Sequence, residues 1–381
     1  MNTSPKPFRV LCVVGARPNF MKIAPIMRAF EAEPVLQGIL LHTGQHYDEA
    51  MKASFFEQLS IPEPDVDLGV GSASHALQTA EIMRRFEPEL DRLRPGAVLV
   101  VGDVNSTIAC ALVAVKKGVP VIHVEAGLRS WDRTMPEEIN RVLTDQISEL
   151  LFTTEQDAAG NLAREGIDPE RIQFVGNVMI DTLLYNRPRA TRPADLLAAL
   201  PDWERLLGEK GYGLLTLHRP SNVDEPDVLR RLLDLLCGLS QELPLVFPVH
   251  PRTRARIEAA GLGHSLERGL LPMPPLGYLD MLGLMGGARL VLTDSGGIQE
   301  ETTALSVPCI TLRENTERPI TVTEGTNTVV GTNPDRIRDA FRQVLEGGGT
   351  TGRVPALWDG HAAERIAAAI VAWFSVRERP A

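Results

Sequence analysis

The segment 97–124, AVLVVGDVNSTIACALVAVKKGVPVIHV, holds one complete strand–helix–strand unit. The apolar run Ala97–Val101 predicts a buried strand, Thr107–Lys117 predicts a helix, and Val119–Val124 predicts a second buried strand. Parallel strands need a crossover of this kind, usually a helix, to join them. The segment therefore predicts an α/β protein with a parallel sheet.

The same alternation of strand and helix continues along the rest of the chain. The stretch Pro188–Asp195, with two prolines and no hydrophobic anchor, marks a linker region near residues 180–195 that separates two halves. In addition, 381 residues are more than one core comfortably organises. We therefore expect two α/β domains. Further strands are expected at Phe8–Val14, Leu36–His42, Leu150–Thr153, Tyr212–Leu217, Leu245–Val249, Arg289–Thr293 and Val307–Leu312, and further helices at Tyr47–Leu59, Ala76–Leu93 and Gly360–Phe374.

The composition excludes several classes of protein. The formal net charge is −10, which argues against nucleic acid as the main partner, because such proteins usually carry a net basic face. No apolar run reaches the roughly 20 residues of a membrane span, and the N-terminus lacks the apolar core of a signal peptide. The four cysteines form no CxxC pair. We expect a soluble, cytoplasmic protein with no membrane partner.

Polar clusters follow the expected strands at the point where each strand ends. In open α/β sheets, ligands bind beyond the carboxyl ends of the strands, where the strand order reverses. Seven such clusters in two halves predict two sheets whose carboxyl edges face a common cleft. The clusters are Gly15–Asn19, Gly102–Ser106, the segment from Glu125, His218–Asn222, His250–Arg252, Asp294–Gly297 and Arg313–Asn315.

The cluster 294–301, DSGGIQEE, has the features of an anion site. Gly296 and Gly297 allow the backbone to approach a ligand closely, and the helix that follows presents free N–H groups. Ser295 adds a hydroxyl donor, and Glu301 is placed to accept from ribose hydroxyls. The alternative is a tight turn with Ser295 as the helix cap. Four cationic side chains could balance the charge of a diphosphate: Arg17, Lys22, His218 and Arg219. Each of them, taken singly, also fits the pattern of a surface cation.

The segment 123–141, HVEAGLRSWDRTMPEEINR, carries an unusual density of charge. Thr134 and Glu137 fit a capping box, and Arg141 lies four residues beyond Glu137, a spacing that suits an ion pair. Glu125, like Asp103, directly follows an apolar strand, where a carboxylate has no evident structural role. Three carboxylates and an arginine are what proton abstraction and leaving-group protonation require. We interpret the remaining charges as loop or surface groups; they are Asp132, Arg133 and Glu138.

Common cofactor motifs are missing from the sequence. There is no GxxxxGK[ST], and the glycine-rich stretch 69–74 does not match GxGxxG, so neither a P-loop nor a nicotinamide cofactor is indicated. Asp65-Val66-Asp67 matches a DxD metal motif only at the scale of a dipeptide, and we interpret it as a solvated loop. We expect neither a metal nor a cofactor.

An ordered set of motifs runs along the chain: GARPNFMKIAPI, TGQHYDEAM, VVGDVNST, HVEAGLRS with MPEEINR, GNVMIDTL, LHRPSN, PVHPR, LTDSGGIQEE and TERP with GTN. This set resembles the motifs of the non-hydrolysing UDP-N-acetylglucosamine 2-epimerases. The match runs from about residue 9 to 333. It implies a glycosyltransferase-B-like fold of two Rossmann-like domains facing a central cleft. The expected domains are 1–183, onto which the C-terminal helix 360–381 packs back, and 184–359, which binds UDP. A homodimer is also implied.

The resemblance further implies a reaction without NAD or metal: anti elimination of UDP to 2-acetamidoglucal, then re-addition with the C2 proton on the other face. The substrate would be a UDP-N-acetylhexosamine, with UDP-N-acetylglucosamine converted to UDP-N-acetylmannosamine. By motif, the implied catalytic residues are Asp103, Glu125, Glu137, Arg141 and His218. The implied UDP contacts are Arg17, Lys22, His218, Ser295, Gly296, Gly297 and Glu301. We hypothesise that Glu125 and Glu137 transfer protons and that Asp103 supports them.

Other functions stay open on the residues alone. They are a hydrolysing 2-epimerase, a 2-epimerase of a modified UDP-hexosamine such as a uronate, a UDP-sugar glycosyltransferase, and a UDP-sugar-binding regulator without turnover. Many family members continue the His-Arg motif with a charged residue and Glu-Asn, whereas Pro220-Ser221-Asn222 follows here. Gln45 and His46 lie in the region that the family associates with activation by a second UDP-N-acetylglucosamine.

Overall fold

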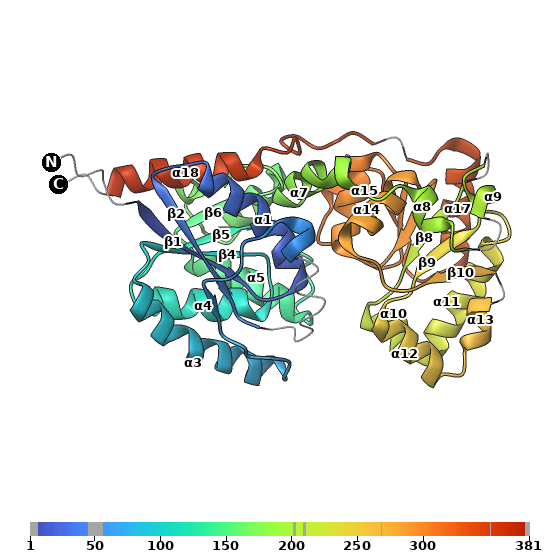
Figure 1. Ribbon diagram of the computed structural model, residues 1–381, viewed down its shortest axis with the longest axis horizontal. Coiled ribbons are helices and arrows are strands. Elements are labelled where there is room, and N and C mark those ends of the chain that lie inside the picture. Colours follow the sequence, from blue (N-terminus) through green and yellow to red (C-terminus); the bar gives the residue numbers. More distant parts are fainter. Residues whose placement is uncertain are drawn as a thin grey trace. The chain divides into compact units, whose positions relative to one another are not determined.

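A computed structural model of the chain describes residues 7–44, 56–200, 203–208, 211–267, 269–350 and 352–377. The chain divides into two compact units (Figure 1). Unit 1 comprises Met1–Tyr185 together with Ala356–Ala381, and unit 2 comprises Asn186–Pro355. Gln45, His46 and most of the helix expected over 47–59 lie outside the described residues.

Unit 1 contains a parallel sheet with the strand order β3-β2-β1-β4-β5-β6-β7. The order reverses between β1 and β4, which pair directly in the register Val10 to Ala97. This is the switch point of a Rossmann-like sheet, where ligand groups gather. The strands are β1 (Phe8–Val14), β2 (Leu36–His42), β3 (Val66–Asp67), β4 (Ala97–Val101), β5 (Val121–Val124), β6 (Leu150–Thr153) and β7 (Ile172–Phe174).

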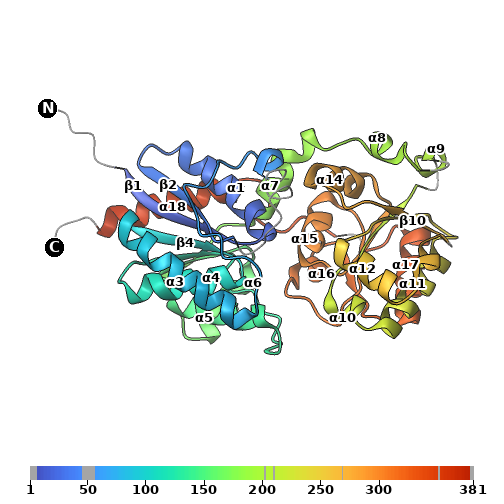
Figure 2. The ribbon, with the colours of Figure 1, turned by 60° about the horizontal axis from the view of Figure 1, so that its bottom comes forward.

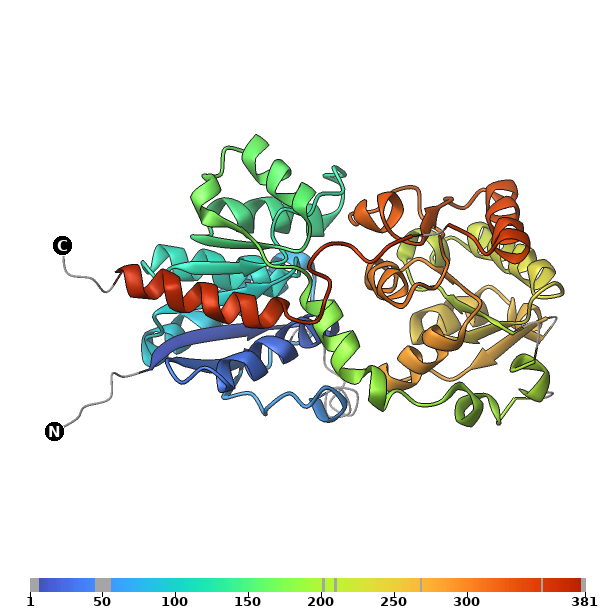
Figure 3. The ribbon, with the colours of Figure 1, turned by 90° about the horizontal axis from the view of Figure 1, so that it is seen from above.

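Helices cover both faces of this sheet. Figure 2 shows α3, α4 and α5 on one face, and Figures 1 and 3 show α1 and the C-terminal α18 on the other. Because both faces are covered, β4 and the part of β1 after Arg9 read as continuous apolar runs rather than as alternating ones. The helices are α1 (Arg17–Glu31), α3 (His75–Leu93), α4 (Asn105–Lys116), α5 (Pro136–Ile147), α6 (Gln156–Arg164), α7 (Val178–Asn186) and α18 (Ala362–Arg377), with a 3-10 turn at Pro169–Arg171. A second 3-10 turn, Arg187–Arg189, lies at the start of unit 2.

The helix α18 returns to unit 1 through contacts at its start. The Asp181 carboxylate on α7 accepts hydrogen bonds from the backbone N–H groups of Ala362 (3.1 Å) and Ala363 (2.7 Å). An acidic side chain thus satisfies the free donors of a helix N-terminus. Just before the helix, the indole N–H of Trp358 donates to the Thr154 carbonyl at 3.0 Å. These polar contacts fix the helix along α1 (Figure 3).

Unit 2 repeats the architecture with the strand order β10-β9-β8-β11-β12-β13, so its switch point lies between β8 and β11. Its strands are β8 (Gly213–Thr216), β9 (Leu245–Pro248), β10 (Leu270–Met273), β11 (Leu290–Thr293), β12 (Cys309–Thr311) and β13 (Asn327–Val329). Its helices are α8 (Pro193–Leu197), α9 (Trp203–Leu206), α10 (Pro220–Val223), α11 (Pro226–Leu239), α12 (Pro251–Ala259), α13 (Gly263–Glu267), α14 (Tyr278–Gly287), α15 (Gly296–Leu305), α16 (Ile320–Thr323) and α17 (Pro334–Gly347).

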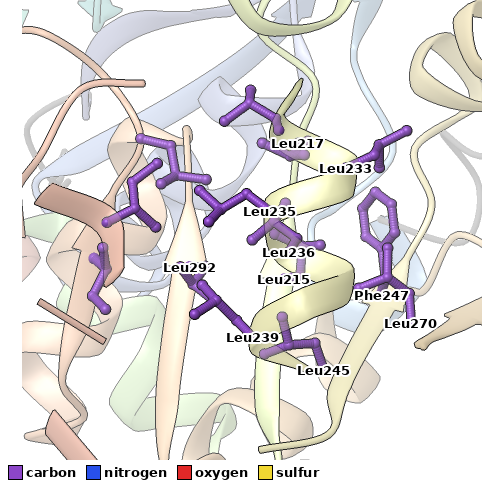
Figure 4. Packing of buried hydrophobic residues seen from close by; sticks show 14 of the residues in the cluster. Leu215, Leu217, Leu233, Leu235, Leu236, Leu239, Leu245, Phe247, Leu270 and Leu292 are labelled. Carbon is purple, nitrogen blue, oxygen red and sulfur yellow. The ribbon is translucent and has the colours of Figure 1, made fainter. Parts of the chain in front are cut away.

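The core of unit 2 is rich in leucine (Figure 4). Leu229, Leu232, Leu233, Leu236 and Leu239 repeat at helical spacing along α11, and all are buried against the sheet. Each fully buried leucine contributes about 1.5–3 kcal/mol relative to an exposed one. The apolar face of α11 therefore holds this layer on β8 and β9.

The predicted α/β class with two Rossmann-like sheets is confirmed, and the nine predicted strands all form. In the part of the chain that the structure describes, four further short strands were not predicted, namely β3, β7, β10 and β13. The interpretation of Asp65-Val66-Asp67 as a solvated loop is wrong, because Val66–Asp67 pairs with β2. Among the described residues, no helix is long and apolar enough to cross a membrane.

Candidate functional site

The switch point of unit 1 is held together by Asn19. This buried side chain accepts hydrogen bonds from the backbone N–H groups of Gly15 (3.2 Å) and Ala16 (3.1 Å), and its amide donates to the Val101 carbonyl (3.0 Å). It thereby joins the end of β1 to the end of β4. Arg17 is the first residue of α1, and its side chain lies outside the described part of the structure.

Lys22 and Glu125 form a buried ion pair at this edge of the sheet. The Lys22 Nζ lies 2.8 Å from Oε1 and 2.7 Å from Oε2 of Glu125. A Cβ added at Gly102 would lie 2.6 Å from Nζ, so the absent side chain of Gly102 leaves room for the ammonium group. Glu125 itself has a backbone φ of 74°, which is sparsely populated for any residue but glycine. The pair therefore lies beside the turn that carries Asp103.

Asp103 is held by Arg141 from the helix α5. The Nη1 of Arg141 lies 2.7 Å from Oδ2 of Asp103, and its Nη2 lies 3.0 Å from Oε2 of Glu138. The interpretation of Glu138 as a surface charge is wrong: its carboxylate is buried and accepts from both the N–H and the hydroxyl of Ser130, at 3.0 Å each, and from the N–H of Trp131. Glu138, not Glu137, is thus the structural partner of Arg141.

Glu137 lies at the second position of α5 and is half-buried. The predicted capping box is wrong, because Met135 is the N-cap and Thr134 bonds to Asp132 instead. In the described part of the chain, the Glu137 carboxylate has no hydrogen-bond or ion-pair partner. A carboxylate without a structural partner is available for a reacting group.

In unit 2, Asp294 joins the ends of β8 and β11. Its buried carboxylate accepts from the backbone N–H groups of His218 and Arg219, from Nδ2 of Asn222 (3.2 Å), and from Nδ1 of His218 (3.0 Å). Burial alone would raise the pKa of Asp294, but the hydrogen bonds and the charge of His218 hold it below its ordinary value. The sequence motif contained Asp294 but did not reveal this contact.

The helix α15 begins at the expected anion site. Ser295 is its N-cap and makes no side-chain capping hydrogen bond, so the capping interpretation of this hydroxyl is wrong. A Cβ added at Gly296 would lie 2.5 Å from Oε1 of Glu317, so a side chain here would force Glu317 to shift. Glu301 is buried one turn into the helix. Burial and this neighbouring carboxylate raise the pKa of Tyr278 well above its ordinary value.

Three arginines surround Glu317 near the start of α15. Arg313 Nη2 lies 2.8 Å from Oε2 of Glu317, and Arg219 Nη2 lies 3.8 Å from Oε1. Burial would raise the pKa of Glu317, but Arg313 and Arg318 hold it well below its usual range. Arg318 also pairs with Glu300 at 2.9 Å. The sequence analysis placed Arg313 in the polar cluster after β12 and Glu317 in the TERP motif, but it named neither as a site residue.

The structure places the predicted residues in two groups. Unit 1 gathers Lys22, Glu125, Asp103 and Arg141, with Glu137 on the first turn of the same helix as Arg141. Unit 2 carries His218, Ser295, Gly296, Gly297 and Glu301 at the ends of β8 and β11. No group of three or more His, Cys, Asp or Glu side chains among the described residues is placed to hold a metal ion.

Known proteins are similar to this chain along nearly its whole length. The sequence model of the family described as UDP-N-acetylglucosamine 2-epimerase matches residues 28–371. The UDP-N-acetylglucosamine 2-epimerase of Methanococcus maripaludis is 41% identical over 343 residues, covering 89% of this chain and 92% of that protein. The UDP-2,3-diacetamido-2,3-dideoxy-D-glucuronate 2-epimerase of Pseudomonas aeruginosa is also 41% identical, over 340 residues that cover 88% of this chain and 92% of that protein.

A solved structure extends the likeness to three dimensions. The crystal structure of Methanocaldococcus jannaschii UDP-GlcNAc 2-epimerase in complex with UDP-GlcNAc and UDP matches with a TM-score of 0.84 at 39% identity. The match covers 96% of this chain and 100% of that chain. The two parallel sheets thus belong to a glycosyltransferase-B-like fold.

Proposed function

We propose that this chain, which belongs to the UDP-N-acetylglucosamine 2-epimerase family, interconverts UDP-N-acetylglucosamine and UDP-N-acetylmannosamine by inverting C2. In the first half-reaction the C2–H bond and the C1–oxygen bond to the diphosphate break, giving 2-acetamidoglucal and UDP. In the second, the C1–oxygen bond re-forms and C2 receives a proton on the opposite face. Atoms and charge balance without an oxidant or a reductant.

The observation that carries the proposal is the arrangement of acids in unit 1. Glu125 is paired with Lys22, and Asp103 is paired with Arg141, at the ends of adjacent strands. Proton abstraction from C2 requires a fixed base, and protonation of the other face requires a second group. Glu137 has no structural partner among the described residues, which suits the second role.

We assign proton transfer to Glu125 and Glu137, with Asp103 and Arg141 supporting them. The Lys22 ammonium group compensates the buried charge of Glu125, since an unpaired carboxylate is costly to bury. Arg141 fixes the carboxylate of Asp103, and the amide of Asn140 donates to the backbone carbonyl of Asp103 at 2.8 Å. Both contacts restrain an acid to one geometry, which is what proton transfer to a bound sugar needs.

Unit 2 supplies the groups that bind UDP in this proposal. The start of α15 offers backbone donors and the Ser295 hydroxyl to the diphosphate, and nearby Arg219 and Arg313 add positive charge. His218, fixed by Asp294, stabilises the departing diphosphate as the C1–oxygen bond breaks. Glu301 accepts from the ribose hydroxyls. Arg17, the first residue of α1 in unit 1, stays a UDP contact that the family resemblance implies.

Nuclear magnetic resonance of the reaction mixture tests this function. The protein is incubated with UDP-N-acetylglucosamine, and the sugar and phosphorus signals are followed together. The expected result is UDP-N-acetylmannosamine at equilibrium with substrate, with the diphosphate linkage intact. Free N-acetylmannosamine accumulating with UDP would identify a hydrolysing epimerase instead.

A second candidate substrate is UDP-2,3-diacetamido-2,3-dideoxy-D-glucuronate. The Pseudomonas aeruginosa enzyme named for that substrate is as similar to this chain as the Methanococcus maripaludis one, at 41% identity each. The same experiment with both nucleotide sugars separates the two. The substrate with the higher kcat/KM is the physiological class, and turnover of neither contradicts the proposed function.

The homodimer and the cytoplasmic location expected from the sequence are part of this proposal. Ile139 and Leu143, one turn apart on α5, are 48% and 49% exposed, which leaves an apolar strip of unit 1 for a second copy to cover. Light scattering at assay concentration is expected to give twice the 41.7 kDa chain mass. A monomeric mass would contradict the dimer.

A further inference from the structure

His123 is a buried histidine whose two ring nitrogens both face hydrogen-bond acceptors. It lies on β5 two residues before Glu125 and is fully buried. Its Nδ1 lies 2.6 Å from Oδ1 of Asp145, and its Nε2 lies 2.9 Å from the carbonyl oxygen of Gly102. A neutral imidazole carries one N–H, so both bonds form only if the ring is an imidazolium or if a proton is shared with Asp145.

The charges around this ring balance one another. Arg129 Nη2 lies 2.7 Å from Oδ2 of Asp145 and 2.6 Å from Oε2 of Glu165. The His123, Asp145 and Arg129 side chains are fully buried, and Glu165 is 18% exposed. Arg129 thus lies between two carboxylates, and with the His123 ring protonated the four groups form a network of two cations and two anions, which is the condition under which buried charges persist.

This network of four side chains is hydrogen-bonded to the backbone on both sides of the acid site. The Gly102 carbonyl, which His123 binds, directly precedes Asp103. The Gly127 N–H, which Asp145 accepts at 3.1 Å, comes two residues after Glu125. One histidine–aspartate pair thus connects the turn after β4 to the turn after β5.

The backbone at Glu125 needs such support. Its φ of 74° costs about 1–3 kcal/mol and persists only where the surroundings determine the conformation. The N–H groups of Glu125 and Ala126 both donate to the Phe152 carbonyl, and the Asp145 bond to Gly127 fixes the next residue. Hydrogen bonds from the N–H groups of three successive residues therefore restrain the strained turn.

We propose that His123, together with Asp145, is a positioning residue for the epimerase reaction: it holds the Gly102 carbonyl and so fixes Asp103 relative to Glu125. The proposal rests on the proposed function, but not on which sugar is the substrate. His123 touches neither side chain, so its effect is on their placement alone. Misplacement of a catalytic group by 1 Å can lower a rate about 10²-fold.

Two neutral substitutions separate placement from general packing. In His123→Gln the amide reaches the position of Nε2 and keeps a donor for Gly102; in His123→Asn it reaches the position of Nδ1 and keeps a donor for Asp145. Both replace the imidazole ring by a neutral amide. We expect His123→Asn to lose kcat by about 10²-fold, His123→Gln to retain about tenfold more than that, and KM to change less than about twofold in either.

Equal losses of kcat in the two variants, or losses that match the folded fraction measured by UDP binding, would overturn the proposal. Turnover by the unsubstituted protein is measured first, so failure of the proposed function is recognised separately. Nitrogen-15 spectra of histidine-labelled protein give a readout that is independent of turnover. The His123 signals, assigned by their loss in His123→Gln, are expected to show a proton on Nε2, which faces the Gly102 carbonyl, and a hydrogen bond at Nδ1, which faces Asp145. An Nε2 without a proton would contradict the geometry.

Discussion

Asp294 binds His218 at two points: its carboxylate accepts from the His218 backbone N–H at 3.0 Å and lies 3.0 Å from Nδ1 of the ring. The ring is therefore held with Nδ1 towards Asp294, and Nε2 is the nitrogen left for a ligand. Since Asp294 directly precedes Ser295, the histidine and the start of α15 are fixed to each other within unit 2. The orientation of the His218 ring is thus set by Asp294, which has no assigned contact with the substrate.

We expect Asp294→Asn to lower kcat about 10²–10⁴-fold, because an amide cannot accept from all four donors and the ring would change its tautomer. Steady-state kinetics measure the loss. In the double variant Asp294→Asn with His218→Ala, the loss should be no larger than in His218→Ala alone, since both remove one function. Additive losses would show that Asp294 acts independently of His218.

Glu137 and Glu138 provide a matched pair on one turn of α5. Glu137→Gln is expected to lower kcat by about 10²-fold or more without changing the unfolding midpoint, because its carboxylate has no structural partner among the described residues. Glu138→Gln is expected to destabilise the fold by about 1–3 kcal/mol, because it weakens buried bonds to Ser130 and Arg141. Full activity in Glu137→Gln would contradict its assignment to proton transfer.

The buried pair of Lys22 and Glu125 makes a prediction about stability. Lys22→Met leaves Glu125 without its ammonium partner and should cost about 3–5 kcal/mol in the free energy of unfolding. Adding Glu125→Gln removes the isolated charge, so the double variant should recover most of that stability while staying inactive. Denaturant unfolding measures both. If the double variant is no more stable than Lys22→Met, the pair does not act through charge compensation.

Asp181 makes the attachment of α18 dependent on pH. Burial, the largest cause, raises the pKa of Asp181 to about 6 from 3.8, against the opposing hydrogen bonds from Ala363 and Ala362. The folded protein therefore binds this proton more tightly than the unfolded chain, and stability from this group falls as pH rises from 3.8 to about 6.

Asp181→Asn does not titrate and serves as the control. The difference in unfolding free energy, unsubstituted protein minus variant, should decrease across that interval and stay constant above it. Urea unfolding at a series of pH values measures the difference. A difference that does not change with pH would contradict the raised pKa.

Much of the fold follows from apolar patterning, and the strands that it missed have a common physical reason. The predicted strands are interior ones with long apolar runs, such as β1 and β4. The missed strands β3, β7, β10 and β13 are the outer strands of the two sheets, with two to four residues each. An edge strand pairs on one side only, so its sequence needs little apolar character and leaves no clear pattern.

The positions of the site residues in the fold were predictable from the sequence, but their ion-pair partners were not. Strand ends placed Asp103, Glu125 and His218 correctly at sheet edges, because topology fixes where a strand ends. The partner of Arg141 depended on where α5 begins. With Met135 as the N-cap, Glu138 takes the third helical position and binds the loop before it. A shift of one residue in a helix start, which sequence does not resolve, exchanged the roles of two neighbouring glutamates.

Solvent isotope incorporation tests whether the C2 proton leaves one face of the sugar and a new proton arrives on the other, as the carboxylates of unit 1 are proposed to do. The reaction is run in D2O with UDP-N-acetylglucosamine and stopped within the first few turnovers. Deuterium is expected at C2 of UDP-N-acetylmannosamine from the earliest product, because the group that protonates the second face draws its proton from solvent. UDP-N-acetylmannosamine that retains protium at C2 would contradict this expectation.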